Sequence, residues 1–315
     1  MEKTAFLYAG QGSQYTGMGK DLYESFPEFR EVIDSLTLGL DVKKVSFENP
    51  DGLLDKTEYT QPCMVAFACG INQTLKKRGI MPDYVCGLSL GEYSALHMAG
   101  VWEACDTIKT VAFRGKVMAR AALGIEAGMS AVIGLSEEQV QACCDEAAAA
   151  GTVSACNYNC PGQIVIGGEK RAVDTACAAA KKMGAKRCLP LAVSGPFHTS
   201  LMKPAGDALE QYFGKIEFQE PKTEVLYDVL GGPIDTKTSI QEVLVRQVQE
   251  PTRMEQVIRY LFRQNVRTFV EIGPGTVLSG FVKKTAKAAR IDSSSYELVA
   301  IESAETVEQA LKIFS

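Results

Sequence analysis

The sequence predicts an α/β fold: a largely parallel sheet covered by helices, with a smaller α/β domain inserted into the larger one. Apolar strand segments alternate with helical segments towards both ends of the chain, and this alternation is typical of a parallel sheet. The middle of the chain follows a different order, β-α-β-β-α-β, which predicts a separate unit. A chain of 315 residues can hold one large domain and one small domain.

Three short apolar runs predict strands of the larger domain, and each run leads to a turn that contains glycine. The strands are residues 5–8, 84–86 and 268–272. The turns that follow them are residues 10–14, 87–91 and 273–275. One mostly apolar helix is predicted at 62–75, before the stop signal Gly79, and another from the second turn to about Met98.

The inserted domain has four predicted strands and two predicted helices. The strands are residues 129–134, 153–156, 163–168 and 186–193. Alanine-rich helices are predicted after Ser136 and at 170–183, and residues 157–162 separate the two middle strands. This order is ferredoxin-like. We expect a small subdomain at 127–194 and a catalytic domain made of 1–126 and 195–315.

Composition argues against several classes of protein. The net charge of −5 provides no basic excess for non-specific nucleic-acid binding. The ten cysteines include no CxxC pair, and the chain has only two histidines, so a zinc site is not expected. Reduced cysteines, a first apolar stretch too short for a secretion signal and the absence of a run of roughly 20 apolar residues predict a cytoplasmic protein outside the membrane.

The first chemical signal is the pattern Gly87-x-Ser89-x-Gly91 between a predicted strand and a predicted helix. A sharp strand-to-helix turn needs small residues around a nucleophile, and it projects the serine oxygen from the edge of the sheet. The amino terminus of the helix also favours negative charge that develops nearby. The alternative is that Ser89 only caps the helix.

A serine nucleophile needs a base, and the chain offers His97 and His198. His97 lies eight residues beyond Ser89 on the same predicted helix, roughly 12 Å along its axis, which is too far for a hydrogen bond. His198 lies in the segment that follows the inserted domain. A histidine in such a glycine-proline loop is often structural, but His198 is the only one able to serve Ser89.

Eight segments follow one another along the chain in a recognisable order. They are GQGSQ at 10–14, TQP at 60–62, GLSLGEYSAL at 87–96, FRGKVM at 113–118, NYNCPGQIVIGG at 157–168, GPFHTSLM at 195–202, RQVQEPTRM at 246–254 and EIGPGTVLSG at 271–280. In these segments the chain resembles the malonyl-CoA:acyl carrier protein transacylases of bacterial fatty-acid synthesis, over essentially the full family length. The resemblance implies an α/β-hydrolase-like core with a ferredoxin-like insert, in agreement with the predicted layout.

The resemblance also implies roles for the catalytic residues. Ser89 would be the nucleophile and His198 its base, in a dyad whose histidine is oriented by the backbone carbonyl of Gln247. The oxyanion would be held by the backbone N–H groups of Gln11 and Leu90. The malonyl group would pass from coenzyme A to Ser89 as an ester, and then to the phosphopantetheine thiol of an acyl carrier protein. Neither a metal nor a bound cofactor is implied.

Four further residues would bind the substrate. Arg114 would hold the malonyl carboxylate through its planar, two-pronged guanidinium. Gln61 and Asn157 would line the pocket, although turn residues with a structural role are an alternative for both. Phe197 matches the bulky residue that precedes the histidine in relatives selective for malonyl over methylmalonyl groups.

The chain departs from the family pattern at two positions. Leu88 replaces a histidine found before the nucleophile in most relatives, and Asp228 replaces a common asparagine. Since the expected oxyanion donors are backbone groups, we expect activity to survive at Leu88, whereas Asp228 puts hydrogen bonding around the histidine loop in question. A serine thioesterase, a non-catalytic carrier-binding module and an acyltransferase that serves polyketide synthesis remain alternatives.

Binding of an acidic carrier protein requires a local basic patch, because the chain is acidic overall. The candidates are Lys181, Lys182, Lys186 and Arg187 on the insert, and Lys283 and Lys284 after the Gly-Pro-Gly turn. Solvated surface charge without a binding role is the alternative for both groups.

Overall fold

The computed structural model describes residues 2–314 and divides the chain into two compact units. The first unit comprises residues 1–116, 218–227 and 259–315, and the second comprises 117–217 and 228–258. Two helices, α6 (Ala104–Ala122) and α11 (Met254–Arg263), each contain a boundary between the units.

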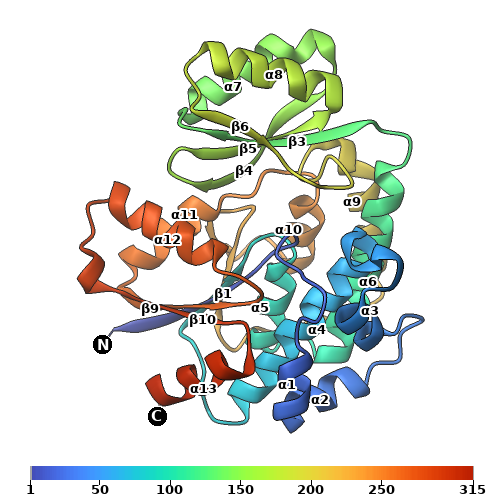
Figure 1. The fold of residues 1–315 in the computed structure, drawn as a ribbon, viewed down its shortest axis with the longest axis vertical. Helices are drawn as coiled ribbons and strands as arrows, with labels where there is room; N and C mark the ends of the chain where they lie inside the picture. Colours follow the sequence, from blue (N-terminus) through green and yellow to red (C-terminus); the bar gives the residue numbers. More distant parts are fainter. Residues whose placement is uncertain (1, 315) are drawn as a thin grey trace. The chain divides into compact units, whose positions relative to one another are not determined.

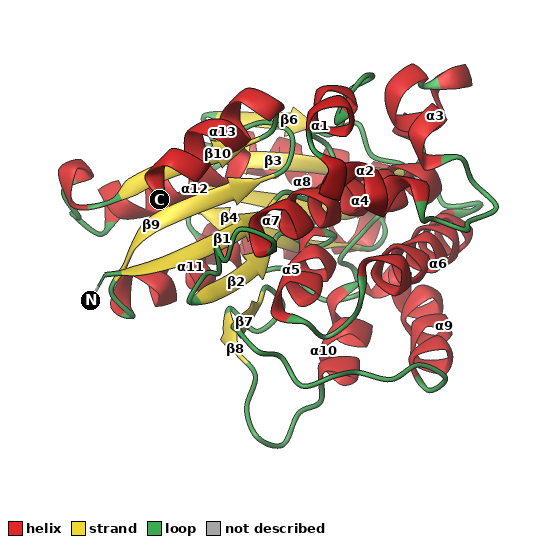
Figure 2. Cartoon of the chain, turned by 90° about the horizontal axis from the view of Figure 1, so that it is seen from below, coloured by secondary structure: helices red, strands yellow, loops and turns green. Residues whose placement is uncertain are grey.

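The first unit is built on a parallel sheet. Its strands are β1 (Lys3–Tyr8), β2 (Tyr84–Gly87), β7 (Glu224–Tyr227), β9 (Val266–Ile272) and β10 (Glu297–Ile301). They lie in the order β10-β9-β1-β2-β7, and every pair among them is parallel (Figure 2). Tyr8 is in register with Gly87 on one side and with Ile272 on the other. The turns that follow these three strands therefore meet at one edge of the sheet.

Helices and short 3₁₀ segments accompany this sheet. They are α1 (Lys20–Ser25), α2 (Pro27–Asp34), α3 (Val42–Glu48), η1 (Pro50–Asp55), α4 (Thr57–Lys76), α5 (Gly91–Ala99), α12 (Val277–Ala288), η4 (Ser293–Ser295) and α13 (Ala304–Ile313). The predicted helix at 62–75 is part of α4, which begins five residues earlier and continues through Pro62. Its residues are buried along most of its length, and this packing outweighs the hydrogen bond that proline cannot make.

The second unit contains the four strands predicted for the insert, and they form an antiparallel sheet. Its strands are β3 (Ala127–Ile133), β4 (Val153–Cys160), β5 (Gln163–Glu169) and β6 (Arg187–Pro190), in the order β4-β5-β3-β6. The helices α7 (Glu137–Ala147) and α8 (Lys170–Lys182) cover one face of this sheet (Figure 1). Val132, Ile164, Ile166 and Val173 pack between the two layers. This is the ferredoxin-like arrangement, inserted into an α/β core.

Strand β4 is longer than the sequence predicts. Residues 157–160, expected to link two strands, continue β4 as far as Cys160. The strand accommodates its polar residues because the register with β5 shifts twice, between Ala155 and Asn157 and between Tyr158 and Cys160. Bulges of this kind change the direction of individual side chains, so a strand can continue through residues that do not fit its regular alternation.

The second unit also contains η2 (Ala148–Ala150), η3 (Ser200–Met202), α9 (Lys203–Phe213), β8 (Gly232–Pro233) and α10 (Ile240–Gln247). All ten cysteines of the chain are free thiols, and seven of them are buried. They act mainly as small apolar side chains, and burial raises the pKa of Cys63 to about 12. None of the helices within residues 2–314 combines the length and the apolar character that a membrane crossing requires.

Candidate active site

Ser89 stands in the turn between β2 and α5, with a backbone φ of 51°. This left-handed conformation is unusual for a residue other than glycine and costs about 1–3 kcal/mol, so the surrounding structure must impose it. A Cβ on Gly87 would lie 2.0 Å from the carbonyl carbon of Gly91, and a Cβ on Gly91 would lie 2.1 Å from the Tyr8 carbonyl oxygen. The two glycines of the motif are therefore sterically required, and the turn presents Ser89 as a nucleophile elbow would.

Backbone contacts hold the residue before the nucleophile. The Leu88 N–H donates to the Tyr8 carbonyl at 3.0 Å, and the Leu88 carbonyl accepts from the Gly91 N–H at 3.0 Å. A Cβ on Gly10 would lie 2.7 Å from the Leu88 carbonyl oxygen, so the turn after β1 approaches this segment closely. These contacts are independent of the side chain at position 88.

Arg114 is the largest fully buried side chain within residues 2–314, and it reaches the nucleophile. From α6, its Nη2 donates to Ser89 Oγ at 3.1 Å and its Nη1 donates to Gln61 Oε1 at 2.9 Å. The guanidinium also lies over the Tyr93 ring, 5.3 Å from the ring centre. These three partners are uncharged. A buried guanidinium with such partners favours an incoming carboxylate, because Arg binds one through two parallel hydrogen bonds.

The predicted oxyanion donors lie at the same edge of the sheet. Gln11 follows β1, and its Oε1 accepts a hydrogen bond from the Thr57 hydroxyl at 2.7 Å. Leu90 is buried and precedes the first residue of α5. An N–H at the start of a helix has no partner within the helix and is available for an anion. The roles of Gln11 and Leu90 remain predictions.

In the second unit, His198 has its imidazole oriented by the backbone. Its Nδ1–H donates to the Gln247 carbonyl at 2.7 Å, which leaves Nε2 as the proton acceptor. The His198 N–H donates to the Val248 carbonyl at 3.1 Å. His198 also has a left-handed φ, of 61°, so both residues of the predicted dyad are held in strained backbone conformations.

The other predicted residues of the second unit are engaged within it. Asn157 Nδ2 donates to the Thr252 hydroxyl at 2.8 Å. Phe197 is buried next to Gly195, where a Cβ would lie 2.8 Å from its ring. Asp228 is fully buried, and its carbonyl accepts from the Arg253 N–H at 2.7 Å.

His97 has the properties of a structural histidine. It is buried on α5, and its Nδ1 lies 3.0 Å from Asn72 Nδ2. Since an amide nitrogen only donates, Nδ1 accepts and the imidazole is neutral. Burial, with a smaller effect of Lys76, lowers the pKa of His97 to about 3. The distance that the sequence predicts between His97 and Ser89 is consistent with a role in packing.

This lowered pKa predicts a loss of stability in mild acid. Between pH 6.5 and about 3 the unfolded chain binds a proton at His97 that the folded chain excludes, so this contribution to stability is complete above pH 6.5 and falls as the pH falls. Urea unfolding measures the free energy of unfolding at pH 7.5 and at pH 5.0. The decrease in this free energy between the two pH values should be about 2 kcal/mol smaller in His97→Gln than in the wild type. An equal decrease in the free energy of unfolding in both proteins would contradict a buried, neutral His97.

The structure places the predicted residues in two sets. Gln11, Gln61, Ser89, Leu90 and Arg114 belong to the first unit, whereas Asn157, Phe197, His198 and Gln247 belong to the second. Sequence reasoning missed Thr57, which bonds to two members of the first set. Its spacing of four residues from Gln61 on a helix could have indicated it. Within residues 2–314, no group of three or more histidine, cysteine or acidic side chains is arranged to hold a metal ion.

Residues 5–310 match the acyl transferase domain family, and the chain belongs to that family. Malonyl CoA-acyl carrier protein transacylase from Bacillus subtilis is 39% identical over 99% of this chain and 97% of its own length. The enzyme of the same name from Escherichia coli is 38% identical over 96% of this chain and all of its own length.

Solved structures agree with these relatives. The malonyl CoA-acyl carrier protein transacylase of Clostridium perfringens superposes with a TM-score of 0.92 at 39% identity, and covers 99% of this chain and 97% of its own. A malonyl-transacylase solved in complex with a type II PKS acyl-carrier protein has a TM-score of 0.92 at 37% identity, and the match covers 99% of each chain.

Proposed function

We infer that this chain is an S-malonyltransferase that moves a malonyl group from malonyl-CoA to the phosphopantetheine thiol of an acyl carrier protein. The relatives and the family support the activity and both substrates. The observation within the molecule that supports it best is the hydrogen bond between buried Arg114 and Ser89 Oγ, at 3.1 Å. This contact puts a carboxylate-binding group beside a nucleophile, as a malonyl thioester requires.

The reaction proceeds in two half-reactions with one intermediate. Ser89 Oγ attacks the thioester carbonyl while His198 Nε2 takes its proton, and the oxyanion is bound by the N–H groups of Gln11 and Leu90. The C–S bond breaks, His198 protonates the coenzyme A thiolate, and malonyl-Ser89 remains. The carrier thiol then attacks this ester, again with His198 as base, and Ser89 is regenerated. Only ester and thioester bonds form and break, so no oxidation state changes, and we propose that the transfer uses neither a redox cofactor nor a metal. We place the reaction in the cytoplasm.

Incubation with malonyl-CoA and holo-carrier protein tests this function directly. The intact mass of the carrier should increase by one malonyl group, with release of coenzyme A. A thioesterase would instead produce free malonate and leave the carrier unchanged, and a non-catalytic module would produce neither. Carriers of fatty-acid and polyketide synthesis should be compared, because one structural relative was solved with a polyketide carrier.

Removal of the base should reduce turnover strongly. His198→Ala deletes the imidazole that the Gln247 carbonyl orients, and we expect kcat to fall at least about 10²-fold, within the usual contribution of a positioned base. His97→Ala should change kcat little, since His97 lies in the core with Asn72. The measurement is steady-state malonyl transfer by both variants. Equal losses would show that His198 has no special role.

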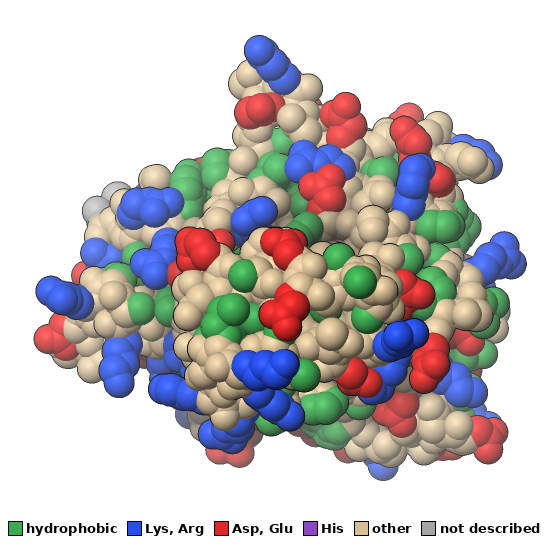
Figure 3. Space-filling model, turned by 90° about the horizontal axis from the view of Figure 1, so that it is seen from above, with side chains coloured by type: hydrophobic (Ala, Val, Ile, Leu, Met, Phe, Trp, Pro, Cys, Tyr) green, Lys and Arg blue, Asp and Glu red, His purple; other side chains and the backbone are tan. Residues whose placement is uncertain are grey.

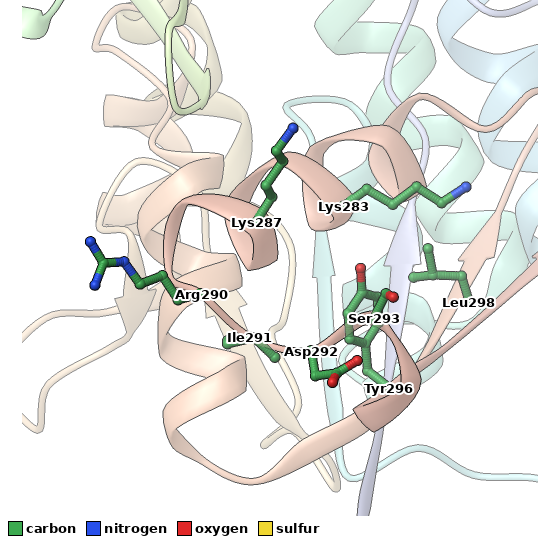
Figure 4. Close-up of a pocket in the computed structure, with 8 residues that line it drawn as sticks. All are labelled: Lys283, Lys287, Arg290, Ile291, Asp292, Ser293, Tyr296 and Leu298. Atoms are coloured by element: carbon green, nitrogen blue, oxygen red, sulfur yellow. The ribbon is translucent and has the colours of Figure 1, made fainter.

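Basic and acidic side chains are interspersed over the face of the protein shown in Figure 3. We therefore expect an acidic carrier protein to bind at a local cluster of basic side chains. In the second unit, Lys181 and Lys182 end α8 and Arg187 begins β6. In the first unit, Lys283 lines a pocket beside Lys287 and Arg290, and these three side chains extend from α12 and the residues after it (Figure 4). None of the three forms an ion pair with any residue in 2–314.

Charge reversal of one of these clusters should raise the KM for carrier protein about tenfold, since exposed charge pairs contribute up to about 1 kcal/mol each. The variants are Lys283→Glu with Lys284→Glu, and Lys186→Glu with Arg187→Glu. The KM for malonyl-CoA should not change. Lys20→Glu with Lys44→Glu, two exposed lysines of the first unit, controls for the change in net charge. An unchanged carrier KM in both cluster variants would refute this docking surface.

A further inference from the structure

A chain of hydrogen bonds joins two parts of the first unit to which different roles are assigned above. Arg114 Nη1 donates to Gln61 Oε1 at 2.9 Å, and Gln61 Nε2 donates to Thr57 Oγ1 at 3.0 Å. The Thr57 hydroxyl in turn donates to Gln11 Oε1 at 2.7 Å. The Thr57 hydroxyl therefore lies between the arginine that binds the malonyl carboxylate and the turn that holds the oxyanion.

The direction of each hydrogen bond follows from the groups themselves. A guanidinium only donates, so Gln61 must present its oxygen to Arg114 and its NH₂ to Thr57. The Thr57 oxygen accepts that bond, and its single proton is then directed at Gln11 Oε1. A hydroxyl at position 57 accepts from Gln61 and donates to Gln11 through a single oxygen atom.

Local structure explains why these groups meet. Thr57 is the first residue of α4 and Gln61 lies four residues later, so their side chains share one face of the helix. Both are almost fully buried, at 2% and 1% exposure. Helix α6 approaches this face closely at Gly115, where a Cβ would lie 2.9 Å from the Thr57 carbonyl oxygen. That approach brings Arg114 within reach of Gln61.

We propose that Thr57 is a positioning residue of the transfer reaction, whose hydroxyl holds the carboxylate-binding Arg114 and the oxyanion turn at Gln11 in a fixed relation. The proposal rests on the function proposed above. A malonyl thioester carries its carboxylate two carbon–carbon bonds from the reacting carbonyl, so the two anion sites must keep a set separation for both to be occupied at once. Thr57 does not touch the substrate in this account and acts through Gln11 and Gln61.

Loss of the hydroxyl has separable effects on the two sites. A released Gln11 side chain loosens the oxyanion turn, and this lowers kcat for any acyl group. A loosened Gln61 leaves Arg114 less well oriented, and this raises KM only for acyl groups with a carboxylate. We expect Thr57→Val to reduce kcat about tenfold with both malonyl-CoA and acetyl-CoA, and to raise KM about threefold with malonyl-CoA alone.

The experiment measures kcat and KM for both substrates, with the same carrier, in matched variants of the full chain. Thr57→Ser keeps the hydroxyl and should retain wild-type kcat and KM within about twofold. Thr74→Val is the control, because Thr74 is a buried threonine of the same helix, and within residues 2–314 its hydroxyl bonds only to the Gly70 carbonyl. It should lower the melting temperature without a change in kcat or KM.

The proposal is overturned if kcat and KM of Thr57→Val equal those of Thr74→Val. It is also overturned if kcat and KM of Thr57→Ser change as much as those of Thr57→Val. Should Thr57→Val not fold, Gln11→Ala breaks the same link from the partly exposed turn while keeping the backbone N–H. It should lower kcat for both substrates, whereas an unimpaired Gln11→Ala refutes the link. Wild-type transfer in the same assay keeps this outcome distinct from a failure of the proposed function.

Discussion

Brief exposure of the wild-type protein to malonyl-CoA should produce a malonyl adduct by intact mass, and Ser89→Ala should produce none. The adduct is the ester of the first half-reaction, and we expect it on Ser89, whose Oγ accepts a hydrogen bond from Arg114 in the turn between β2 and α5. Alanine keeps the Cβ of Ser89 and hence the cost of its left-handed φ of 51°, so the fold should be unaffected. The loss of the adduct would then be due to the missing Ser89 oxygen.

Ser94→Ala provides the matched control. Ser94 is a buried serine of α5, the helix that follows the turn of Ser89, and its removal should leave the adduct at the wild-type level. Peptide mapping of the wild-type adduct should locate the malonyl group on Ser89. An undiminished adduct in Ser89→Ala would place the ester elsewhere and remove the basis of the proposed mechanism.

The part of this site that can be predicted from the sequence is the turn where only glycine fits beside the backbone. Gly87 and Gly91 stand where any side chain would collide with backbone, so the turn around Ser89 is visible in the sequence. The order of strands and helices in the insert could also be predicted, because hydrophobic periodicity and the Ser136 helix cap are local signals.

Other parts of the site leave no such local signal. The partner of His198 Nδ1 is a backbone carbonyl, a group that every residue has, so only the family resemblance pointed to Gln247. Asn157 pairs with Thr252, 95 residues away, and neither residue type marks the pair. Thr57 was missed because a threonine at the start of a helix is typical of a cap, whereas here its hydroxyl bonds to Gln11 and Gln61.

Arg114→Ala should reduce malonyl transfer roughly 10²- to 10³-fold and leave acetyl transfer unchanged or improved. A buried carboxylate that loses its charged partner typically costs about 3–5 kcal/mol, and about 1.4 kcal/mol corresponds to a tenfold change in rate. Water that enters the emptied site would reduce the loss, so the lower end of this range is also consistent. An acetyl group carries no carboxylate, so its transfer includes no ion pair with Arg114 that the substitution could remove.

The hydrogen bond from Arg114 Nη2 to Ser89 Oγ sharpens this expectation. In the absence of a carboxylate, the guanidinium donates to the nucleophile itself and withdraws electron density from the oxygen that must attack. Its removal frees Ser89 Oγ for an acetyl thioester, which is why acetyl transfer can improve. The measurement is kcat/KM for malonyl-CoA and acetyl-CoA in wild type and variant with one carrier, and Arg120→Ala, an exposed arginine near the end of α6, is the control. Equal loss with both substrates would show that Arg114 serves the fold, and the assignment of malonyl selectivity to this residue would then be wrong.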